Sequence, residues 1–133
     1  SPIQFDVTRR NATEPPFDNP YWRERREGIY VDITNGQPLF LSTDKYSSQC
    51  GWPSFSRPIN DTLLTRVPDN TAGMQRTEVR SRIGDAHLGH VFNDGPAQSG
   101  GLRYCINSAA LRFIPRSQMA EQGYADYLPL LPD

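Results

Sequence analysis

Two cysteines and two histidines are the side chains of this sequence best suited to redox or proton-transfer chemistry. Cys50 and Cys105 are 55 residues apart, and neither belongs to a Cys-x-x-Cys pair, which excludes a zinc held by four cysteines. His87 and His90 are three positions apart, and Asp94 follows four positions after His90. This spacing suits a proton donor near a nucleophile, but it suits two structural histidines equally well. A zinc bound by both cysteines and both histidines is disfavoured, because ligand pairs usually come from short local loops and these cysteines are isolated.

The two cysteines leave three interpretations open: a structural disulfide, two buried unreactive thiols, or a catalytic redox pair. A structural disulfide is unusual in a reducing cytosol. The thiolate is the reactive form of a cysteine, and a nearby cation favours it. Arg103 precedes Cys105 by two residues and would share its face of a strand. Trp52, in a Gly-Trp-Pro turn after Cys50, is either an exposed aromatic platform or, more commonly, part of the core.

The segment 102–113 changes the phase of its apolar residues. Apolar side chains occupy even positions up to Ile106 and odd positions from Leu111 onwards. A continuous strand cannot bury both sets on one face, because side chains alternate between faces with a period of two. We therefore expect a bulge or break between Asn107 and Ala110.

That break would lie beside a cluster of polar and reactive groups. Before it, Arg103, Cys105 and Asn107 would share the face opposite Tyr104 and Ile106. Bulges are frequent next to active sites. These three side chains therefore form a candidate site.

Composition favours a small, loop-rich β domain that spans residues 1–133. The 12 prolines and 10 glycines imply many turns, and the 6 tyrosines, 6 phenylalanines and 2 tryptophans favour strands over helices. The net charge of −1 gives no basic field that would attract nucleic acid or an anionic membrane. No apolar run approaches the roughly 18 residues of a spanning helix, and no export signal is evident. We expect a chain processed, tagged or excised from a longer one, because it starts at Ser1 rather than Met.

Local signals near the N-terminus predict little regular structure. Residues 1–19 are expected to form an irregular arm with at most one helical turn near 6–10. A short helix is predicted over 21–27, because Asn19-Pro20 supplies an N-cap followed by a proline at the first helical position.

The remaining signals predict mainly strands. Asn35-Gly36 between two apolar stretches predicts a hairpin with a type I′ turn, since both residues tolerate positive φ. Further strands are predicted at 63–67, 74–83 and 87–92, and helical turns within 42–49 and 117–122.

Ordered motifs run through most of the chain. The longest are GWPSF at 51–55, RTEVRS at 76–81, GDAHLGHVFNDGP at 84–96 and RYCINS at 103–108, with TEPPF at 13–17, PLF at 38–40 and LRFIP at 111–115 around them. This set resembles the methionine-R-sulfoxide reductase B family from about Thr13 to Pro129. The resemblance implies a mainly β fold of two antiparallel sheets, barrel-like or sandwich-like, with short peripheral helices.

The resemblance also implies an enzyme that reduces methionine R-sulfoxide, in proteins or free, to methionine. Cys105 matches the nucleophile of the family, which becomes a sulfenic acid, and Cys50 matches the cysteine that then forms a disulfide with it. His90 matches the main acid. The expected roles of the other matching residues are to hold the imidazole, a water and the sulfoxide oxygen (His87, Asp94, Asn107), to stabilise the thiolate (Arg103) and to pack on the S-methyl group of the substrate (Trp52).

The same resemblance implies the partners and cofactors. Thioredoxin is the expected reductant of the disulfide, with a potential of about −270 mV, and no metal or organic cofactor is required. Many family members hold a structural zinc with two Cys-x-x-Cys pairs, but the matching positions here are Asp32, Asn35, Ser81 and Gly84. We therefore expect a zinc-free form. A cytoplasmic monomer is also expected, although a domain of a larger or exported protein is an alternative.

Two interpretations from other classes compete with an enzyme. One is a secreted β module with a structural Cys50–Cys105 disulfide and only a binding role. The other is a zinc-binding interaction module.

Overall fold

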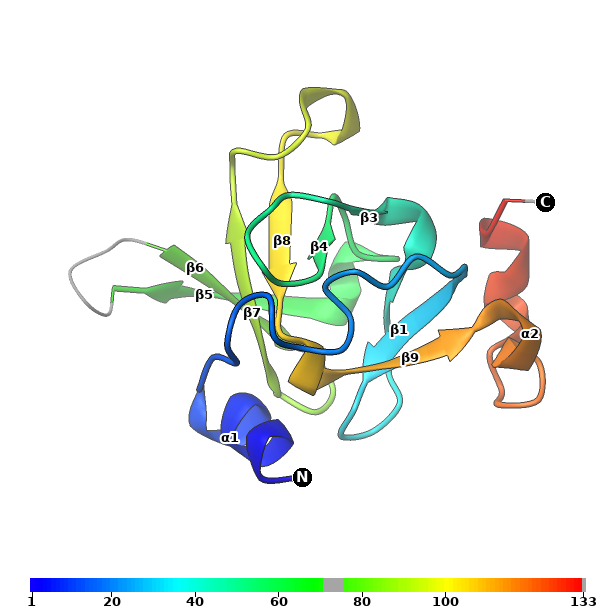
Figure 1. Ribbon diagram of the computed structural model, residues 1–133, viewed down its shortest axis with the longest axis horizontal. Coiled ribbons are helices and arrows are strands. Elements are labelled where there is room, and N and C mark those ends of the chain that lie inside the picture. Colours follow the sequence, from blue (N-terminus) through cyan, green and yellow to red (C-terminus); the bar gives the residue numbers. More distant parts are fainter. Residues whose placement is uncertain (71–75, 133) are drawn as a thin grey trace.

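The computed structural model describes residues 1–70 and 76–132 and shows two antiparallel β-sheets (Figure 1). The smaller sheet has the strand order β2-β1-β9, with β1 at Gly28–Asp32, β2 at Pro38–Leu41 and β9 at Leu111–Pro115. The larger sheet has the order β3-β4-β8-β7-β6-β5, and its strands are Lys45–Tyr46 (β3), Ser54–Phe55 (β4), Leu64–Asp69 (β5), Arg76–Ser81 (β6), His87–Phe92 (β7) and Arg103–Ile106 (β8). Neither sheet closes into a barrel within these strands. The architecture is a small sandwich-like domain, which confirms the predicted mainly β fold.

Aromatic side chains from both sheets fill the space between them. Phe40 of β2 stacks on Phe55 of β4 with ring centroids 4.4 Å apart, and Tyr30 of β1 meets Phe55 at 5.1 Å. Tyr104 of β8 joins the same buried cluster. Aromatic rings bury a large apolar area each, so this cluster holds the two sheets together.

The predicted break after β8 is confirmed, and it is the point where the chain changes sheets. β8 ends at Ile106 in the larger sheet, a 3-10 turn follows at Ser108–Ala110, and β9 begins at Leu111 in the smaller sheet. The phase change in the sequence therefore reflects two strands that bury their apolar sides from two different sheets.

The prediction of an irregular N-terminal arm is wrong for its first half. Residues Pro2–Arg10 form helix α1, with Pro2 in its first turn and a capping box between Ser1 and Gln4. Val7 is fully buried, and α1 lies beside β7 and the Ser108–Ala110 turn (Figure 1). One buried apolar residue gives almost no helical periodicity, which is why the pattern in the sequence missed this helix.

The helix predicted over 21–27 does not form. Asn19 does not cap a helix but donates its side-chain amide to the carbonyls of Pro15 and Gly51. The carboxylate of Glu24 accepts from the backbone N–H groups of Arg25 and Arg26. Such local side-chain bonds give the backbone an alternative to helical hydrogen bonds.

The hairpin β1–β2 is confirmed, but its turn is not type I′. Only Gly36 has a positive φ, of 78°. The N–H of Gly36 donates to the carbonyl of Asp32, and the N–H of Asp32 donates to the carbonyl of Gln37. The Asp32 carboxylate also accepts from the N–H and hydroxyl of Thr34, which favours a longer loop over a two-residue turn.

The other predicted elements are close to those observed. Strands β5, β6 and β7 fall where they were predicted, although Met74, the predicted start of β6, lies outside the described residues. A 3-10 turn forms at Ser42–Asp44, helix α2 spans Arg116–Met119, and a further 3-10 segment spans Ala125–Leu130.

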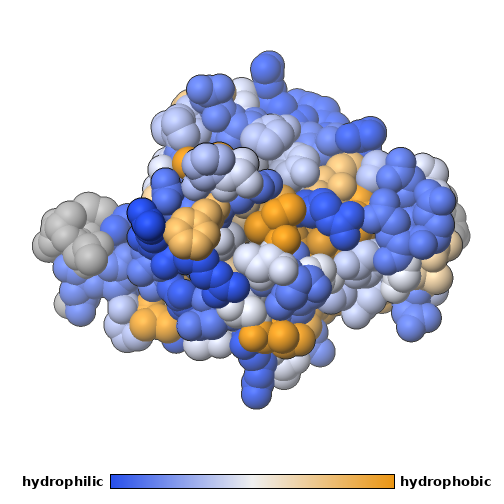
Figure 2. All heavy atoms as spheres, turned by 90° about the horizontal axis from the view of Figure 1, so that it is seen from below, coloured by the Kyte–Doolittle hydropathy of each residue, from blue (hydrophilic) through white to orange (hydrophobic). Residues whose placement is uncertain are grey.

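Seen from below, the surface is mostly hydrophilic, with hydrophobic residues in separate patches (Figure 2). Within the described residues, no helix has the length and hydrophobicity needed to cross a membrane.

Candidate active site

The register of the larger sheet places a row of polar side chains across one of its faces. Tyr46 of β3 pairs with Ser54 of β4, Ser54 pairs with Cys105 of β8, Cys105 pairs with His90 of β7, and His90 pairs with Glu78 of β6. Directly paired residues on antiparallel strands point to the same face. The opposite face carries the core residues, so the sheet separates the chemistry from the aromatic cluster.

A β-bulge brings the two histidines onto that same face. Residues three apart on a regular strand point to opposite faces. Here Glu78 pairs with His90 but Arg80 pairs with His87, so β7 carries one extra residue, Leu88, between them. The two imidazole rings consequently lie 5.7 Å apart in an edge-on arrangement. The sequence spacing alone would have separated them.

A glycine permits the close pairing of β7 and β8 at this point. A Cβ atom on Gly89 would lie 2.0 Å from the backbone oxygen of Cys105. Any side chain at this position would push β8 and its cysteine away from the histidines.

The two cysteines meet although they are 55 residues apart in the chain. Their Sγ atoms are 2.8 Å apart, both are free thiols, and Cys105 is buried while Cys50 is half-buried. Ser54 lies 3.3 Å from the Cys50 sulfur through its hydroxyl, and the hydroxyl of Ser48 donates to that sulfur at 3.1 Å. The interpretation of two separate inert thiols is therefore excluded by the geometry.

The two thiols share a proton. The hydrogen bond from the Cys105 thiol lowers the pKa of Cys50 to about 4, with help from Ser48 and Ser54. The same contact, together with burial, raises the pKa of Cys105, and the guanidinium of Arg103 opposes that rise. The pair therefore loses one proton readily and holds the second firmly.

Each histidine has a carboxylate partner that sequence analysis missed. Nδ1 of His87 lies 2.7 Å from Glu78, and Nε2 of His90 lies 2.8 Å from Asp69. Burial lowers the pKa of His87, so its ring is neutral and donates its Nδ1 proton to Glu78. This leaves the buried Nε2 of His87 as an acceptor without a partner in the described structure. Glu78 stands in the RTEVRS motif, but only the strand register shows that it faces the site.

Two of the expected site residues have other partners than the resemblance suggested. Asp94 is exposed and forms a two-point salt bridge with Arg103, whose guanidinium lies 4.3 Å above the Phe92 ring. Asn107 is buried, and its amide donates to the carbonyl of Leu88. In the described parts of the chain, neither Asp94 nor Asn107 bonds to a histidine.

The backbone of Glu14 links Trp52 and Asn107 to the N-terminal arm. The indole N–H of Trp52 donates to the Glu14 carbonyl at 3.0 Å, and the Glu14 N–H donates to the Asn107 side-chain oxygen at 2.9 Å. The Glu14 side chain accepts from the N–H groups of Ser108 and Ala109. Trp52 is thus held beside Cys50 from one side, with part of its ring exposed.

A hollow of about 490 Å³ opens beside the cysteines, lined by Tyr46, Ser48, Cys50, Asp94, Gly95, Pro96 and Arg103. It connects the sulfur of Cys50 with solvent and with the Arg103–Asp94 pair. The arrangement offers a thiol pair, two carboxylate-paired imidazoles, and a guanidinium at one opening. That combination suits thiol attack on a polar substrate with proton transfer.

Three of the four positions that would hold zinc in related chains, Asp32, Asn35 and Gly84, come together, but with other side chains. A Cβ on Gly84 would lie within 3.1 Å of atoms of Asn35, Thr34 and Asp32, and Ser81 accepts from the N–H of Ala86. Among the described residues, no group of three or more His, Cys, Asp or Glu is arranged to hold a metal. The absence of zinc stays a prediction.

Comparison with known proteins gives the family. The SelR domain model matches residues 1–115. Over 128 residues, the chain is 61% identical to a protein of Vibrio cholerae, the peptide methionine sulfoxide reductase MsrA/MsrB. The match covers 96% of this chain and 34% of that relative, so the chain spans about a third of its length. The chain therefore belongs to the SelR domain family, which is the methionine-R-sulfoxide reductase B family that its motifs resemble.

Proposed function

We propose that this domain reduces methionine R-sulfoxide, in proteins or free, to methionine by thiol chemistry at Cys105. The observation that carries the proposal is the pair of free thiols 2.8 Å apart on the polar face of the larger sheet, beside two carboxylate-paired histidines. A buried structural disulfide would not need titratable partners around it. The membership of the SelR domain family supplies the substrate class.

In the first step, Cys105 attacks the sulfur of the sulfoxide. Its proton passes to the Cys50 thiolate, 2.8 Å away, as an S–S bond forms between Cys105 and the substrate sulfur. The oxygen, once protonated, moves to the sulfur of Cys105 as the S–S bond and the substrate S–O bond break, so methionine leaves and Cys105 becomes a sulfenic acid. His90 supplies a proton to the departing oxygen, since an unprotonated oxygen is a poor leaving group. The sulfoxide is reduced by two electrons and Cys105 is oxidised by two.

In the second step, Cys50 condenses with the sulfenic acid. The Cys50–Cys105 disulfide forms, and the sulfenic hydroxyl leaves with the thiol proton as one water. An external dithiol then reduces this disulfide, and thioredoxin is the proposed reductant. Because the two sulfurs already touch, the condensation needs no large movement of the chain.

The side of Trp52 that remains exposed provides an apolar surface for the S-methyl group of the substrate. Its indole is fixed by the bond to the Glu14 carbonyl, which gives the pocket a defined wall. A fixed wall discriminates between the two epimers of a sulfoxide, because only one places its oxygen toward the histidines.

We further propose that the domain acts as a cytoplasmic monomer.

Separated R and S epimers of methionine sulfoxide test this function. With thioredoxin recycling, the R epimer is expected to turn over and the S epimer to give little or no methionine. Equal rates for the two epimers would reject the assignment.

A further inference from the structure

A second hollow, of about 310 Å³, lies on the other side of Tyr46 from the cysteines. The segment 22–26 forms one side of it, and Ser42, Lys45, Tyr46 and Ser47 form the other. Four cationic side chains line this hollow, against the single carboxylate of Glu24. We call it the basic pocket.

Three of the four cations of the basic pocket form no salt bridge within the described residues. The ammonium of Lys45 is half-buried and donates only to the carbonyl of Trp22, at 3.3 Å. The guanidinium of Arg25 is exposed, and it forms no salt bridge with any of the residues that the structure describes. Glu24, the nearest carboxylate, is already bound to Arg26 at 2.8 Å. The pocket therefore has a surplus of donors that an anion would satisfy.

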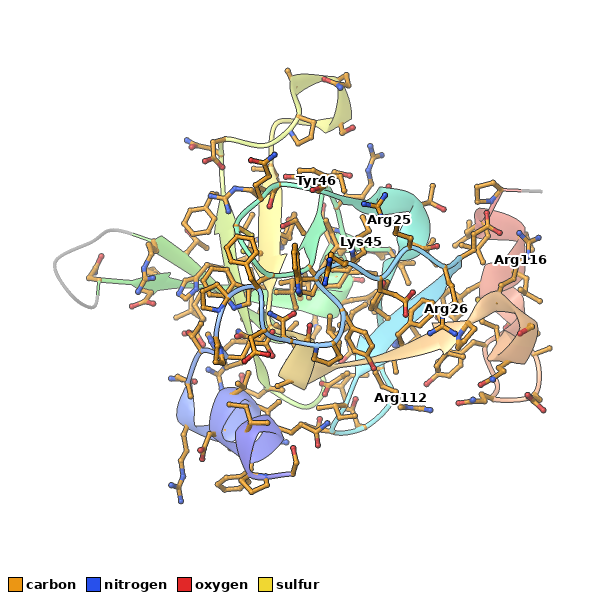
Figure 3. All side chains as sticks on the ribbon, viewed as in Figure 1. Arg25, Arg26, Lys45, Tyr46, Arg112 and Arg116 are labelled. Carbon is orange, nitrogen blue, oxygen red and sulfur yellow. The ribbon has the colours of Figure 1, made fainter. Side chains whose placement is uncertain are left out.

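The position of Lys45 is electrostatically costly without such an anion. Burial lowers its pKa, the neighbouring charge of Arg25 lowers it further, and Glu24 offsets only part of this. A carboxylate between Lys45 and Arg25 would relieve both effects, since opposite charge favours the ammonium form. Figure 3 shows Arg25 and Lys45 next to each other beside Tyr46, whereas Arg112 and Arg116 lie apart from them.

The basic pocket shares a wall with the hollow beside the cysteines. Tyr46 lines both, and Ser47 of one is followed directly by Ser48 of the other. Lys45 and Cys50 are five positions apart in the chain, so the distance between them is at most that of five extended residues, at about 3.3 Å each. A bound, extended polypeptide therefore spans this distance with at most about five residues. A polypeptide whose oxidised methionine lies over Cys105 therefore reaches the basic pocket with a nearby side chain.

We propose that the basic pocket binds an acidic side chain of the substrate polypeptide, within about five residues of the oxidised methionine. The inference rests on the proposed function and specifies its substrate class: proteins with Asp or Glu close to the methionine sulfoxide. The carboxylate would accept from the ammonium of Lys45 and from the guanidinium of Arg25. Free methionine sulfoxide, which lacks such a side chain, does not use the pocket.

The test uses peptides that contain one methionine R-sulfoxide. One series places a single Glu at each position from five before to five after the sulfoxide, and a matched series has Gln there. At one or two positions, Glu is expected to raise kcat/KM by roughly five- to tenfold over Gln, as expected for a charge-assisted contact at a partly buried site. The advantage is expected to shrink in high salt.

Variants assign the effect to the pocket. Arg25→Gln and Lys45→Gln are each expected to remove most of the Glu advantage and to leave the rate with free methionine sulfoxide unchanged. Arg112→Gln is the matched control, because it removes one exposed cation whose hydrogen bond within the described residues goes to Gln122. Arg25→Glu is expected to abolish the Glu advantage, because the new carboxylate occupies the ammonium of Lys45 and repels an acidic side chain.

Two outcomes would overturn the inference. One is equal kcat/KM for every Glu and Gln pair; the other is a Glu advantage that Arg112→Gln reduces as much as Arg25→Gln does. Calorimetric binding of the same peptides to the Cys105→Ser variant makes the comparison without turnover. If neither free methionine sulfoxide nor any of the peptides is reduced but Glu peptides bind more tightly than Gln peptides, the proposed function fails and the pocket assignment stands.

Discussion

The chemistry of the cysteine pair depends on one short contact. With the sulfurs 2.8 Å apart, the charge of the single thiolate is stabilised by the neighbouring thiol and by two serine hydroxyls. The contact lowers the pKa of Cys50 and raises the pKa of Cys105. In the proposed mechanism, Cys105 therefore becomes a reactive nucleophile only as its proton moves to Cys50.

Replacement of each cysteine is expected to block the reaction at a different step. Cys105→Ser is expected to abolish methionine formation, since the hydroxyl is too weak a nucleophile. Cys50→Ser is expected to release about one methionine per enzyme in a single turnover and to trap a sulfenic acid on Cys105, while turnover with thioredoxin collapses. Quenched-flow measurement of methionine checks both. Stoichiometric methionine from the Cys105→Ser variant would mean that Cys50 is the attacking thiol.

The shared proton predicts a pH profile for alkylation. Because the pKa of Cys50 is lowered to about 4, its thiolate persists above that pH and is lost only as the pH falls through about 4. In Cys105→Ala the main cause of the lowering is gone, so the pKa of Cys50 is expected to return toward the ordinary thiol value of about 8.5. Less than about a tenth of the thiol is then ionised at pH 6, and reactivity toward iodoacetamide at that pH is expected to drop at least tenfold. Mass spectrometry identifies the alkylated residue. Unchanged alkylation of Cys50 in that variant would contradict the assignment.

Sequence reasoning found the residues of the site better than their contacts. The family motifs contain Cys105 and both histidines, Cys50 directly precedes the GWPSF motif, and the structure brings these four together. Glu78 and Asp69 were not predicted, because a carboxylate in a strand has no signal of its own until the register fixes its neighbour across the sheet. That register includes the bulge at Leu88, which no pattern in the sequence predicted.

At the scale of elements, the junction between β8 and β9 determines where Cys105 stands. Glu14 reaches it from the N-terminal arm and is 3% exposed. Its carboxylate binds the N–H groups of Ser108 and Ala109, which begin the 3-10 turn and would otherwise be buried without partners. The arm is therefore a structural part of the site and not an appendage to it.

Removal of this carboxylate is expected to destabilise the fold. Glu14→Ala leaves two buried N–H donors unpaired, and at about 1–3 kcal/mol each this lowers the free energy of unfolding by roughly 2–6 kcal/mol. Denaturant unfolding measures the loss. Glu121→Ala, an exposed site, is the control and is expected to change stability by less than about 0.5 kcal/mol. Equal stability of the two variants would refute the role of Glu14.

The same carboxylate predicts a pH dependence of stability. Burial raises the pKa of Glu14 above its usual 4.5, against the hydrogen bonds from Ala109 and Ser108. The folded state therefore binds the carboxyl proton of Glu14 more tightly than the unfolded state. The stability that this tighter proton binding contributes is fully present below about pH 4.5 and is lost as the pH rises through the raised pKa. As the pH rises through the raised pKa, the Tm of the wild type is expected to fall relative to the Tm of Glu14→Gln, whose side chain does not titrate. A wild-type Tm that rises relative to Glu14→Gln over the same pH range would contradict the predicted direction.

The elements themselves were predictable to different degrees. The phase change at 107–110 was visible because strand faces alternate strictly, and the structure shows the break at that place. Helix α1 was missed because its apolar residues show only a weak helical periodicity. A capping box and one buried valine stabilise the helix instead. The helix at 21–27 was wrongly predicted because local bonds from Glu24 and Asn19 satisfy the backbone in another way.

At the scale of the molecule, two loops far apart in the sequence close one end of the domain. The hairpin loop after β1 and the turn after β6 meet where Gly84 lies against Asn35 and Asp32. Gln37 joins them further, since its side chain donates to the Leu63 carbonyl and accepts from the Ile83 N–H. Hydrogen bonds among side chains and backbone thus connect the loops that zinc connects in many related chains.

Metal analysis checks this difference. Elemental analysis of the purified protein is expected to find far less than one zinc per chain, and a chelator is expected to leave Tm unchanged, because Asp32, Asn35, Ser81 and Gly84 provide no thiolate. One tightly held zinc per chain would show that other side chains took over the role. The two-sheet arrangement was predictable from motifs, but the hydrogen bonds between these two loops depend on tertiary contacts.

The contact of Glu14 with Ser108 and Ala109 also sets the order in which the molecule can assemble. It joins residues 94 and 95 positions apart, so a large loop must close before Cys105 is fixed. During synthesis, Cys50 leaves the ribosome well before Cys105 and the turn that follows it. The first cysteine thus stays a solitary, ordinary thiol in the nascent chain, and the pair gains its acidity only when the two ends of the domain have met.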